Sequence, residues 1–124
     1  MSSIFYLLTD DSPIGYFHRN RSDIVHYWHQ GGSLRYFLID QAGTLETIVL
    51  GPDLASGEQL QLLVPGNTWK ATELLGGEYG LLSEAVCPGF DYGDMELASK
   101  DTLATAFPAL WRTHGQQLSA LCQS

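Results

Sequence analysis

Hydrophobic and polar residues alternate along most of the chain, in short runs rich in β-branched and aromatic residues. The runs recur at nearly even spacing and are separated by Gly, Pro, Asp and Asn. They predict strands at residues 4–8, 22–30, 34–40, 45–51, 58–66, 68–75 and 79–87. Short strands with hairpin-length connections are typical of an all-β sandwich or barrel. The glycine pairs at 31–32 and 76–77 are expected to be turns, because neither precedes a helix.

The pattern changes after residue 98. The apolar residues that recur there at helical spacing are Leu103, Phe107, Leu110, Trp111, Leu118 and Leu121. Ser99 or Asp101 is expected to cap a first short helix, and Pro108 to lie in the first turn of a second. The sequence therefore predicts a β-barrel over residues 1–98 and a helical tail packed on it over residues 99–124.

Charge narrows the range of partners. With 124 residues the chain is one domain of ordinary size, and its 6 basic against 14 acidic residues give a formal net charge of −8. Such a surface repels a phosphate backbone and an anionic membrane, so neither nucleic acid nor a membrane is expected as a partner. No apolar run approaches the roughly 20 residues of a membrane span. Two cysteines make no disulfide framework, and a cytoplasmic protein is expected.

The stretch HRNRSDIVHYWHQGG holds three of the four histidines, His18, His26 and His29. In a regular strand alternate side chains share a face, so His26 lies with Trp28 while His29 faces the opposite side. His29, near a turn, is expected in solvent, whereas His26 has apolar neighbours and needs a hydrogen-bond partner. On the preceding strand His18 shares a face with Asn20.

Four segments carry a family resemblance: SIFYLL, HRNRSDIVHYWHQGGSL, LGPDLASGEQLQLLVPGNTWKATEL and AVCPGFDYGDMELAS. They are similar to a small, uncharacterised branch of the cupin superfamily, once labelled a domain of unknown function. The resemblance covers residues 3–98. It implies a double-stranded β-helix, the cupin jelly roll, with a ligand cavity inside the barrel and usually a homodimer. Sugar-nucleotide epimerases share this barrel.

The metal-binding pattern of cupins is mostly absent. In the motif H-x-H-x3-E-x6-G the three ligand positions hold His18, Asn20 and Ile24. In the motif P-x-G-x2-H, Asn67 takes the place of the glycine and Lys70 that of the histidine. A lysine ammonium is a poor metal ligand, so we expect no resident metal and no other cofactor. An alternative remains in which His26 replaces the missing carboxylate and a metal-dependent enzyme uses His18 and His26.

The resemblance and the alternation together predict the lining of the cavity. Its expected members are His18, Asn20, His26, Trp28, Tyr36, Trp69 or Lys70, and Glu84 or Ala85. Aromatic walls with a few converging polar groups are typical of a small-molecule pocket. We assign His18 as a base and Tyr36 as an acid, with His26 as a further catalytic candidate. The others, Asn20, Trp28, Trp69, Lys70 and Glu84, are expected to bind the ligand.

Two classes of function remain open. The first is a metal-independent isomerase, epimerase or lyase that acts on a small polar metabolite by acid/base chemistry. The second is a non-catalytic ligand-binding or pathway accessory protein of the same fold.

Two expectations concern surfaces. In the family branch that this chain resembles, a P-E-G-G segment and a short strand come before the strand that corresponds to SIFYLL. That segment is absent here, and we expect the tail after Pro108 to cover the place that it would occupy. The apolar strand LRYFLI is expected to support a homodimer.

Overall fold

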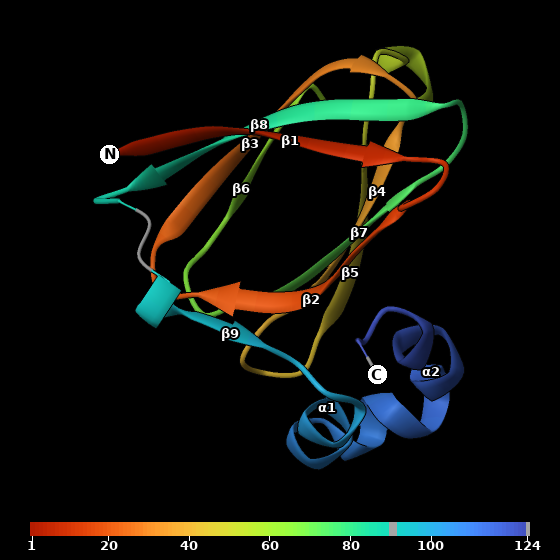
Figure 1. Ribbon diagram of the computed structural model, residues 1–124. Helices are drawn as coiled ribbons and strands as arrows, with labels where there is room; N and C mark the ends of the chain where they lie inside the picture. Colours follow the sequence, from red (N-terminus) through yellow and green to blue (C-terminus); the bar gives the residue numbers. More distant parts are fainter. Residues whose placement is uncertain (90–91, 124) are drawn as a thin grey trace.

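Two antiparallel sheets face each other in the computed structural model, which describes residues 1–89 and 92–123 (Figure 1). The first sheet contains, in spatial order, β1 (Ser2–Thr9), β8 (Tyr79–Cys87), β3 (Asp23–Gly31) and β6 (Gln61–Val64). The second contains β5 (Leu45–Leu50), β4 (Leu34–Ile39), β7 (Trp69–Leu74), β2 (Ile14–Asn20) and β9 (Met95–Leu97). The predicted all-β architecture is confirmed.

The turns follow the predicted chemistry. Gly31 ends β3 with φ 91°, and a Cβ on it would lie 2.3 Å from the carbonyl oxygen of Tyr79, so this position requires glycine. Asn67, at the glycine position of the second motif, also has a positive φ of 63°, which asparagine tolerates better than most residues. A single-turn helix, η1 (Leu54–Ser56), fills the loop before β6, and a second, η2 (Tyr92–Asp94), precedes β9.

Two elements differ from the expected pattern. The strand before residue 22, for which we predicted no bounds, is β2; it begins at Ile14, and its pairing with β7 shifts register between Gly15 and His18. The three-residue β9 was not predicted, because so short a strand exists only through its pairing with the end of β2. Both differences lie beside the cavity described below.

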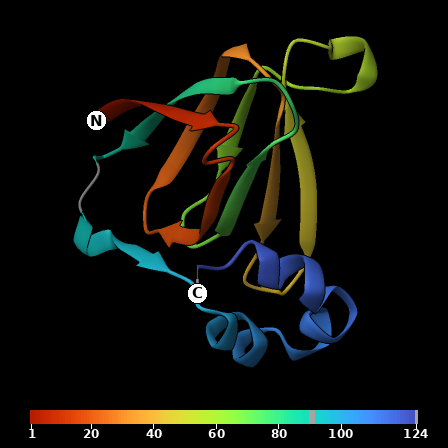
Figure 2. The ribbon, with the colours of Figure 1, turned by 45° about the vertical axis from the view of Figure 1, so that its right-hand side comes forward.

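The tail forms the two predicted helices, α1 (Lys100–Ala106) and α2 (Pro108–Ala120). Ser99 caps α1 in a reciprocal pair of hydrogen bonds with Thr102, and Pro108 begins α2. Both helices pack on the outer face of the second sheet (Figure 2). The core they share with that sheet comprises Phe17, Phe37, Ile39, Trp69, Ala71, Ala98, Leu103, Leu118, Leu121 and Cys122.

A second core fills one end of the space between the sheets. It contains Leu8, Leu34, Tyr36, Leu38, Leu50, Leu62, Val64 and Leu82. Because the strand LRYFLI lies between β5 and β7 with five of its six side chains buried, it offers no surface to a second copy, contrary to our expectation. No helix in the described part of the chain is long and apolar enough to cross a membrane.

We expected the tail to cover the first strand, but it does not. Its apolar residues dock on the second sheet, while β1 is an edge of the first and leaves Phe5 and Leu7 exposed. The reason is geometric, since the open face of the second sheet presents Phe17, Phe37 and Trp69 to the helices.

Candidate active site

Polar side chains converge inside the barrel because five strands each turn one of them inward. Antiparallel pairing sets His26 of β3 opposite Glu84 of β8, and His18 of β2 opposite Lys70 of β7. Tyr36 of β4 lies beside them, fully buried. The structure thus brings together all three predicted catalytic candidates and two of the predicted ligand-binding residues.

Four of these side chains form one connected network. The Tyr36 hydroxyl lies 2.9 Å from His26 Nδ1, and Lys70 Nζ lies 3.1 Å from His26 Nε2. Glu84 Oε1 is 3.6 Å from Lys70 Nζ and 3.4 Å from His26 Nε2. An ammonium only donates, so His26 Nε2 accepts from Lys70 and His26 Nδ1 carries the hydrogen that it donates to Tyr36. Both nitrogens of His26 are therefore engaged.

Burial sets the charge states of this network. It lowers the pKa of His26 well below 6.5, and the nearby charges of Lys70 and His18 lower it further. Burial also lowers the pKa of Lys70, although the nearby carboxylate of Glu84 opposes this effect by raising it. The pKa of Tyr36 is raised, first by burial and then by Glu84. At neutral pH the barrel thus contains a neutral imidazole and a neutral phenol beside the Lys70–Glu84 pair.

His18 lies outside this network and has a different hydrogen-bond partner. Its Nδ1 lies 2.8 Å from the carbonyl oxygen of Tyr16. Because a carbonyl oxygen can only accept a hydrogen bond, Nδ1 carries the hydrogen and donates it, and the free lone pair of the ring is on Nε2. Burial, assisted by the charge of Lys70, lowers its pKa to about 4, although the bond to Tyr16 raises it. His18 is therefore an unprotonated base throughout the physiological pH range.

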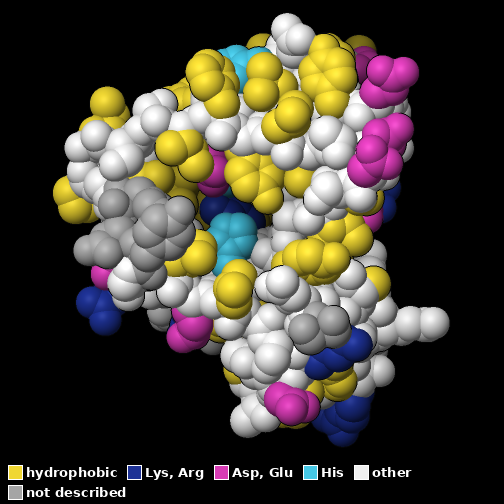
Figure 3. Space-filling model, in the orientation of Figure 1, with side chains coloured by type: hydrophobic (Ala, Val, Ile, Leu, Met, Phe, Trp, Pro, Cys, Tyr) yellow, Lys and Arg dark blue, Asp and Glu magenta, His cyan; other side chains and the backbone are white. Residues whose placement is uncertain are grey.

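Two spaces adjoin these residues and share part of their lining. A narrow recess of about 20 Å³ reaches His26, Tyr36 and Lys70, and it has room for one water molecule. A wider cavity of about 220 Å³ lies outside it, between the first sheet and the ends of β2 and β9. Figure 3 shows a hollow rimmed by hydrophobic side chains, in which a histidine is visible with basic and acidic side chains deeper inside. Tyr6, His18 and Glu84 line both spaces and so mark their junction.

The wider cavity is apolar apart from a few groups. Ile4, Ile24, Val86 and Met95 line it together with the amide of Asn20. Asn20 is 8% exposed, and its Oδ1 is buried with no hydrogen-bond partner among the described residues.

Tyr6 is a member of the site that the sequence did not suggest. It lies on β1, lines both spaces, and has a pKa raised first by burial and then by Glu84. A Cβ on residue 15 would come within 3.1 Å of its hydroxyl, so Gly15 makes room for it. The apolar run IFYLL concealed Tyr6, although alternation with the buried Leu8 places both side chains on the inner face.

The two predicted tryptophans lie elsewhere. Trp69 points out of the barrel into the core beneath the helices, where the guanidinium of Arg19 stacks 4.5 Å from its ring centroid. Alternation along β7 turns Lys70 inward instead. Trp28 faces the second core and donates from Nε1 to the Gly32 carbonyl at 3.1 Å. Neither tryptophan lines the cavity, so these two expectations were wrong, while Glu84 rather than Ala85 faces inward.

His29 behaves as predicted. It is exposed on the outer face of β3, where its Nε2 lies 2.7 Å from the hydroxyl of Ser83. It has no connection with the cavity.

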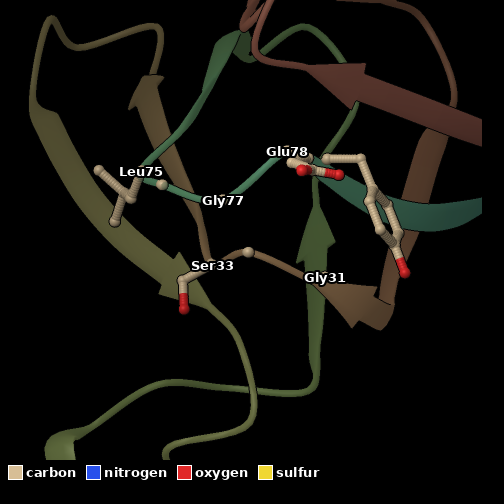
Figure 4. A pocket seen from close by; sticks show the side chains of 8 residues that line it. Gly31, Ser33, Leu75, Gly77 and Glu78 are labelled. Carbon is tan, nitrogen blue, oxygen red and sulfur yellow. The ribbon is translucent and has the colours of Figure 1, made fainter.

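A larger hollow of about 480 Å³ lies at the other end of the barrel, between two turns (Figure 4). Gly31 and Gly77 contribute only backbone to it, and the side chains of Ser33, Leu75 and Glu78 do not converge on a common point. It lacks the clustered acid and base groups of the smaller cavity, so we place the candidate site at His18.

The donor set does not fit a transition metal. Lys70 Nζ is in contact with both His26 Nε2 and Glu84 Oε1, so an ammonium already takes the position from which a metal ion would reach them. Within residues 1–89 and 92–123 no three His, Cys, Asp or Glu side chains are arranged to hold a metal ion. The alternative of a metal held by His18 and His26 therefore has no support from the geometry.

Comparison with known proteins agrees with this architecture. The family model described as "Cupin superfamily (DUF985)" matches residues 1–98. The chain belongs to this cupin family. The predicted resemblance and the jelly-roll fold are thereby confirmed.

Individual relatives extend the comparison. The uncharacterized protein YML079W of Saccharomyces cerevisiae is 43% identical over 95 residues, which cover 73% of this chain and 47% of that protein. The cupin chain thus spans about half the length of this curated relative. Protein SO0799 from Shewanella oneidensis has a TM-score of 0.89 at 34% identity, over 98% of this chain and 74% of its own.

A dTDP sugar isomerase from Desulfovibrio desulfuricans has the same barrel. Its TM-score is 0.69 at 21% identity, over 96% of this chain and 74% of that one. At this identity the similarity shows the fold alone.

Proposed function

We propose that this cupin is a metal-independent acid/base enzyme that shifts a proton next to a carbonyl group of a small polar metabolite, as an isomerase or epimerase does. The observation that carries the proposal is the fixed tautomer of His18. Its bond to Tyr16 leaves the Nε2 lone pair available, and the residue lies where the cavity joins the recess. The dTDP sugar isomerase with the same barrel supports this class by analogy of fold.

Each step can be assigned to a group of the site. His18 Nε2 takes a proton from the carbon next to the carbonyl, and the electron pair of the broken C–H bond forms an enolate. The Tyr6 hydroxyl, whose raised pKa keeps it protonated, donates a hydrogen bond to the enolate oxygen. Protonation of that carbon on its other face by water, while the proton on His18 passes to solvent, gives the epimer. If that carbon bears a hydroxyl group, transfer of the hydroxyl proton to the enolate oxygen and of the His18 proton to the former carbonyl carbon gives the isomer.

Tyr6 takes the role that we first assigned to Tyr36. Tyr36 is fully buried behind His26, in a recess with room for one water molecule. We assign Tyr36 and His26 to positioning Lys70, whose ammonium is paired with Glu84 and lies across from His18.

Proton exchange tests the proposal without knowledge of the natural substrate. The protein is incubated in D₂O with 4-hydroxycyclohexanone, and loss of the protons next to the carbonyl is followed by NMR. The native chain is expected to accelerate exchange over buffer, and His18→Gln to lose about 100-fold or more of that acceleration. His29→Gln, which removes an exposed histidine outside the cavity, is the matched control and should exchange at the native rate.

Three results would contradict the proposal. Exchange at the native rate in His18→Gln would show that another group is the base. Binding of the ketone without any exchange would favour the second class, a ligand-binding cupin without catalysis. Treatment with EDTA is expected to leave the exchange rate unchanged, and loss of exchange on chelation would contradict the metal-independent mechanism.

We also propose that the protein is a cytoplasmic homodimer. Cys87 and Cys122 are free thiols, which suits a reducing compartment.

A further inference from the structure

The amide of Asn20 is held in place with an unused acceptor. Its backbone is fixed on both sides, since its carbonyl accepts from the Asn67 amide at 2.7 Å and its strand pairs with Met95 of β9. Asn20 lines the cavity, and its side-chain Oδ1 is buried and has no hydrogen-bond partner among the described residues. A buried acceptor without a donor is unfavourable, so such a group in a cavity indicates a donor that arrives from outside.

The charges around the cavity argue against an anionic ligand. Glu84 is the acidic group of its lining, and His18, with a pKa of about 4, is neutral at physiological pH. Lys70 does not line the wider cavity and is paired with Glu84. A phosphate or carboxylate placed there would therefore meet a carboxylate and no unpaired cation among the described lining residues.

Arg19 and Arg21, the neighbours of Asn20 in the sequence, do not line the cavity; they line a separate hollow beside it, and both are paired. Arg19 stacks on Trp69 outside the barrel and forms a 3.0 Å ion pair with Glu96. Arg21 is largely exposed, and its Nε lies 3.9 Å from Asp94. Both guanidinium groups are therefore already engaged by carboxylates.

The remaining lining is hydrocarbon. Ile24, Val86 and Met95 cover the walls next to Asn20. At about 220 Å³ the cavity is smaller than the roughly 300–1,000 Å³ of pockets for drug-sized ligands, so a compact ligand or one ring of a larger ligand fits.

From these observations we infer that the cavity selects an uncharged, compact hydroxy-carbonyl compound, whose hydroxyl donates to Asn20 Oδ1 while its hydrocarbon body contacts Ile24, Val86 and Met95. The inference rests on the proposed function for the position of the carbonyl near His18. The selectivity for a neutral hydroxyl group is a property of binding and is measured without turnover.

The test compares three probes of similar shape by NMR titration of the isotope-labelled protein. 4-Hydroxycyclohexanone carries the donor, 4-methylcyclohexanone replaces the hydroxyl by a methyl group, and cyclohexyl phosphate carries an anion. Probes of this size bind with dissociation constants of about 1 mM at ordinary ligand efficiencies. The hydroxyl compound is expected to bind about fivefold tighter than the methyl compound, which the apolar walls alone would favour, and cyclohexyl phosphate to bind weakest.

Substitution of Asn20 identifies the acceptor. In Asn20→Leu, which has nearly the same size without an oxygen, the preference for the hydroxyl should reverse. Asn20→Ala should abolish it as well and serves if the leucine variant fails to fold. Ile24→Val, which trims the same wall and leaves the amide, should keep the preference.

Several outcomes would overturn the inference. They are equal binding of the hydroxyl and methyl probes to the native chain, a preference that survives in both Asn20 variants, tighter binding of cyclohexyl phosphate, and no titration of cavity signals by any probe. His18→Gln should retain the hydroxyl preference while it loses proton exchange, so failure of the chemistry and failure of the selectivity are seen separately.

Discussion

Lys70 and Glu84 form an ion pair inside a protein core, where neither charge is stable alone. Their side chains are 3% and 11% exposed, and the hydrogen bond to His26 helps to hold the ammonium. Desolvation makes such pairs costly to form, and removal of one partner leaves an uncompensated charge.

Lys70→Met is therefore expected to destabilise the protein by about 3–5 kcal/mol, because it leaves the carboxylate of Glu84 buried and unpaired. The double variant Lys70→Met/Glu84→Leu should recover most of that loss. Urea denaturation of the native, single and double variants measures both effects. If the double variant were as unstable as the single one, the loss would come from packing and not from the stranded charge.

The neutral state of His18 predicts how stability depends on pH. Its pKa is about 4 in the folded chain and 6.5 without perturbation, so between these values the unfolded chain binds the extra proton. Stability is therefore lost as the pH falls through this window. The charged and titratable groups that face the His18 ring are Lys70, His26 and Glu84. Between pH 7 and pH 4.5 the contribution of His18 alone is about 2 kcal/mol.

Urea denaturation at pH 7 and pH 4.5 tests this dependence. His18→Gln should lose about 2 kcal/mol less than the native chain over the same interval. An equal loss in the two proteins would show that His18 titrates alike in the folded and unfolded chains.

The helices of the tail are stabilised both by local capping and by packing against the second sheet. α1 has only seven residues, too few to be stable alone, and it depends on its cap and on the burial of Leu103 against the sheet. Ser99 accepts from the Thr102 amide at 3.1 Å, and Thr102 Oγ1 accepts from the Ser99 amide at 3.3 Å.

Ser99→Ala is expected to lower the free energy of unfolding by about 1 kcal/mol, and amide hydrogen exchange should accelerate first in α1. The cavity lies on the other side of the second sheet from the helices, so the binding of 4-hydroxycyclohexanone should not change. Weaker binding in this variant would show that the tail supports the cavity.

The two outer faces of the barrel differ over the whole molecule. Helices cover the second sheet, whereas the first leaves Phe5, Leu7, Tyr27 and Leu63 exposed. None of these four side chains is charged, although the chain carries a net charge of −8. Two acidic copies repel each other least across such a face, so we expect the homodimer to form there and not through β4.

Leu63→Asp should therefore convert the dimer to a monomer at micromolar concentration, as measured by light scattering. Leu54→Asp is the control, since Leu54 is 59% exposed on η1 and lies outside this face. A monomeric native protein would refute the dimer, and a Leu63→Asp variant that remains a dimer would place the interface elsewhere.

The sequence by itself determined the sheet architecture, the two helices and the identity of most polar groups in the barrel. Period-two alternation, glycine at Gly31, the Ser99 cap and Pro108 are local signals, which act within a few neighbouring residues. Together with the family resemblance, they led us to expect His18, His26 and Tyr36 in the cavity, and they left the choice between Glu84 and Ala85 open.

Only the tertiary structure decided what those groups touch. The register shift between Gly15 and His18 turns both residues toward the cavity, and it depends on how β2 pairs with β7. The choice of Lys70 over Trp69, the entry of Tyr6 and the isolation of the Asn20 oxygen depend on which strand lies opposite which. Because these contacts join residues far apart along the chain, a local pattern can state which way a side chain faces but not the partner that it meets.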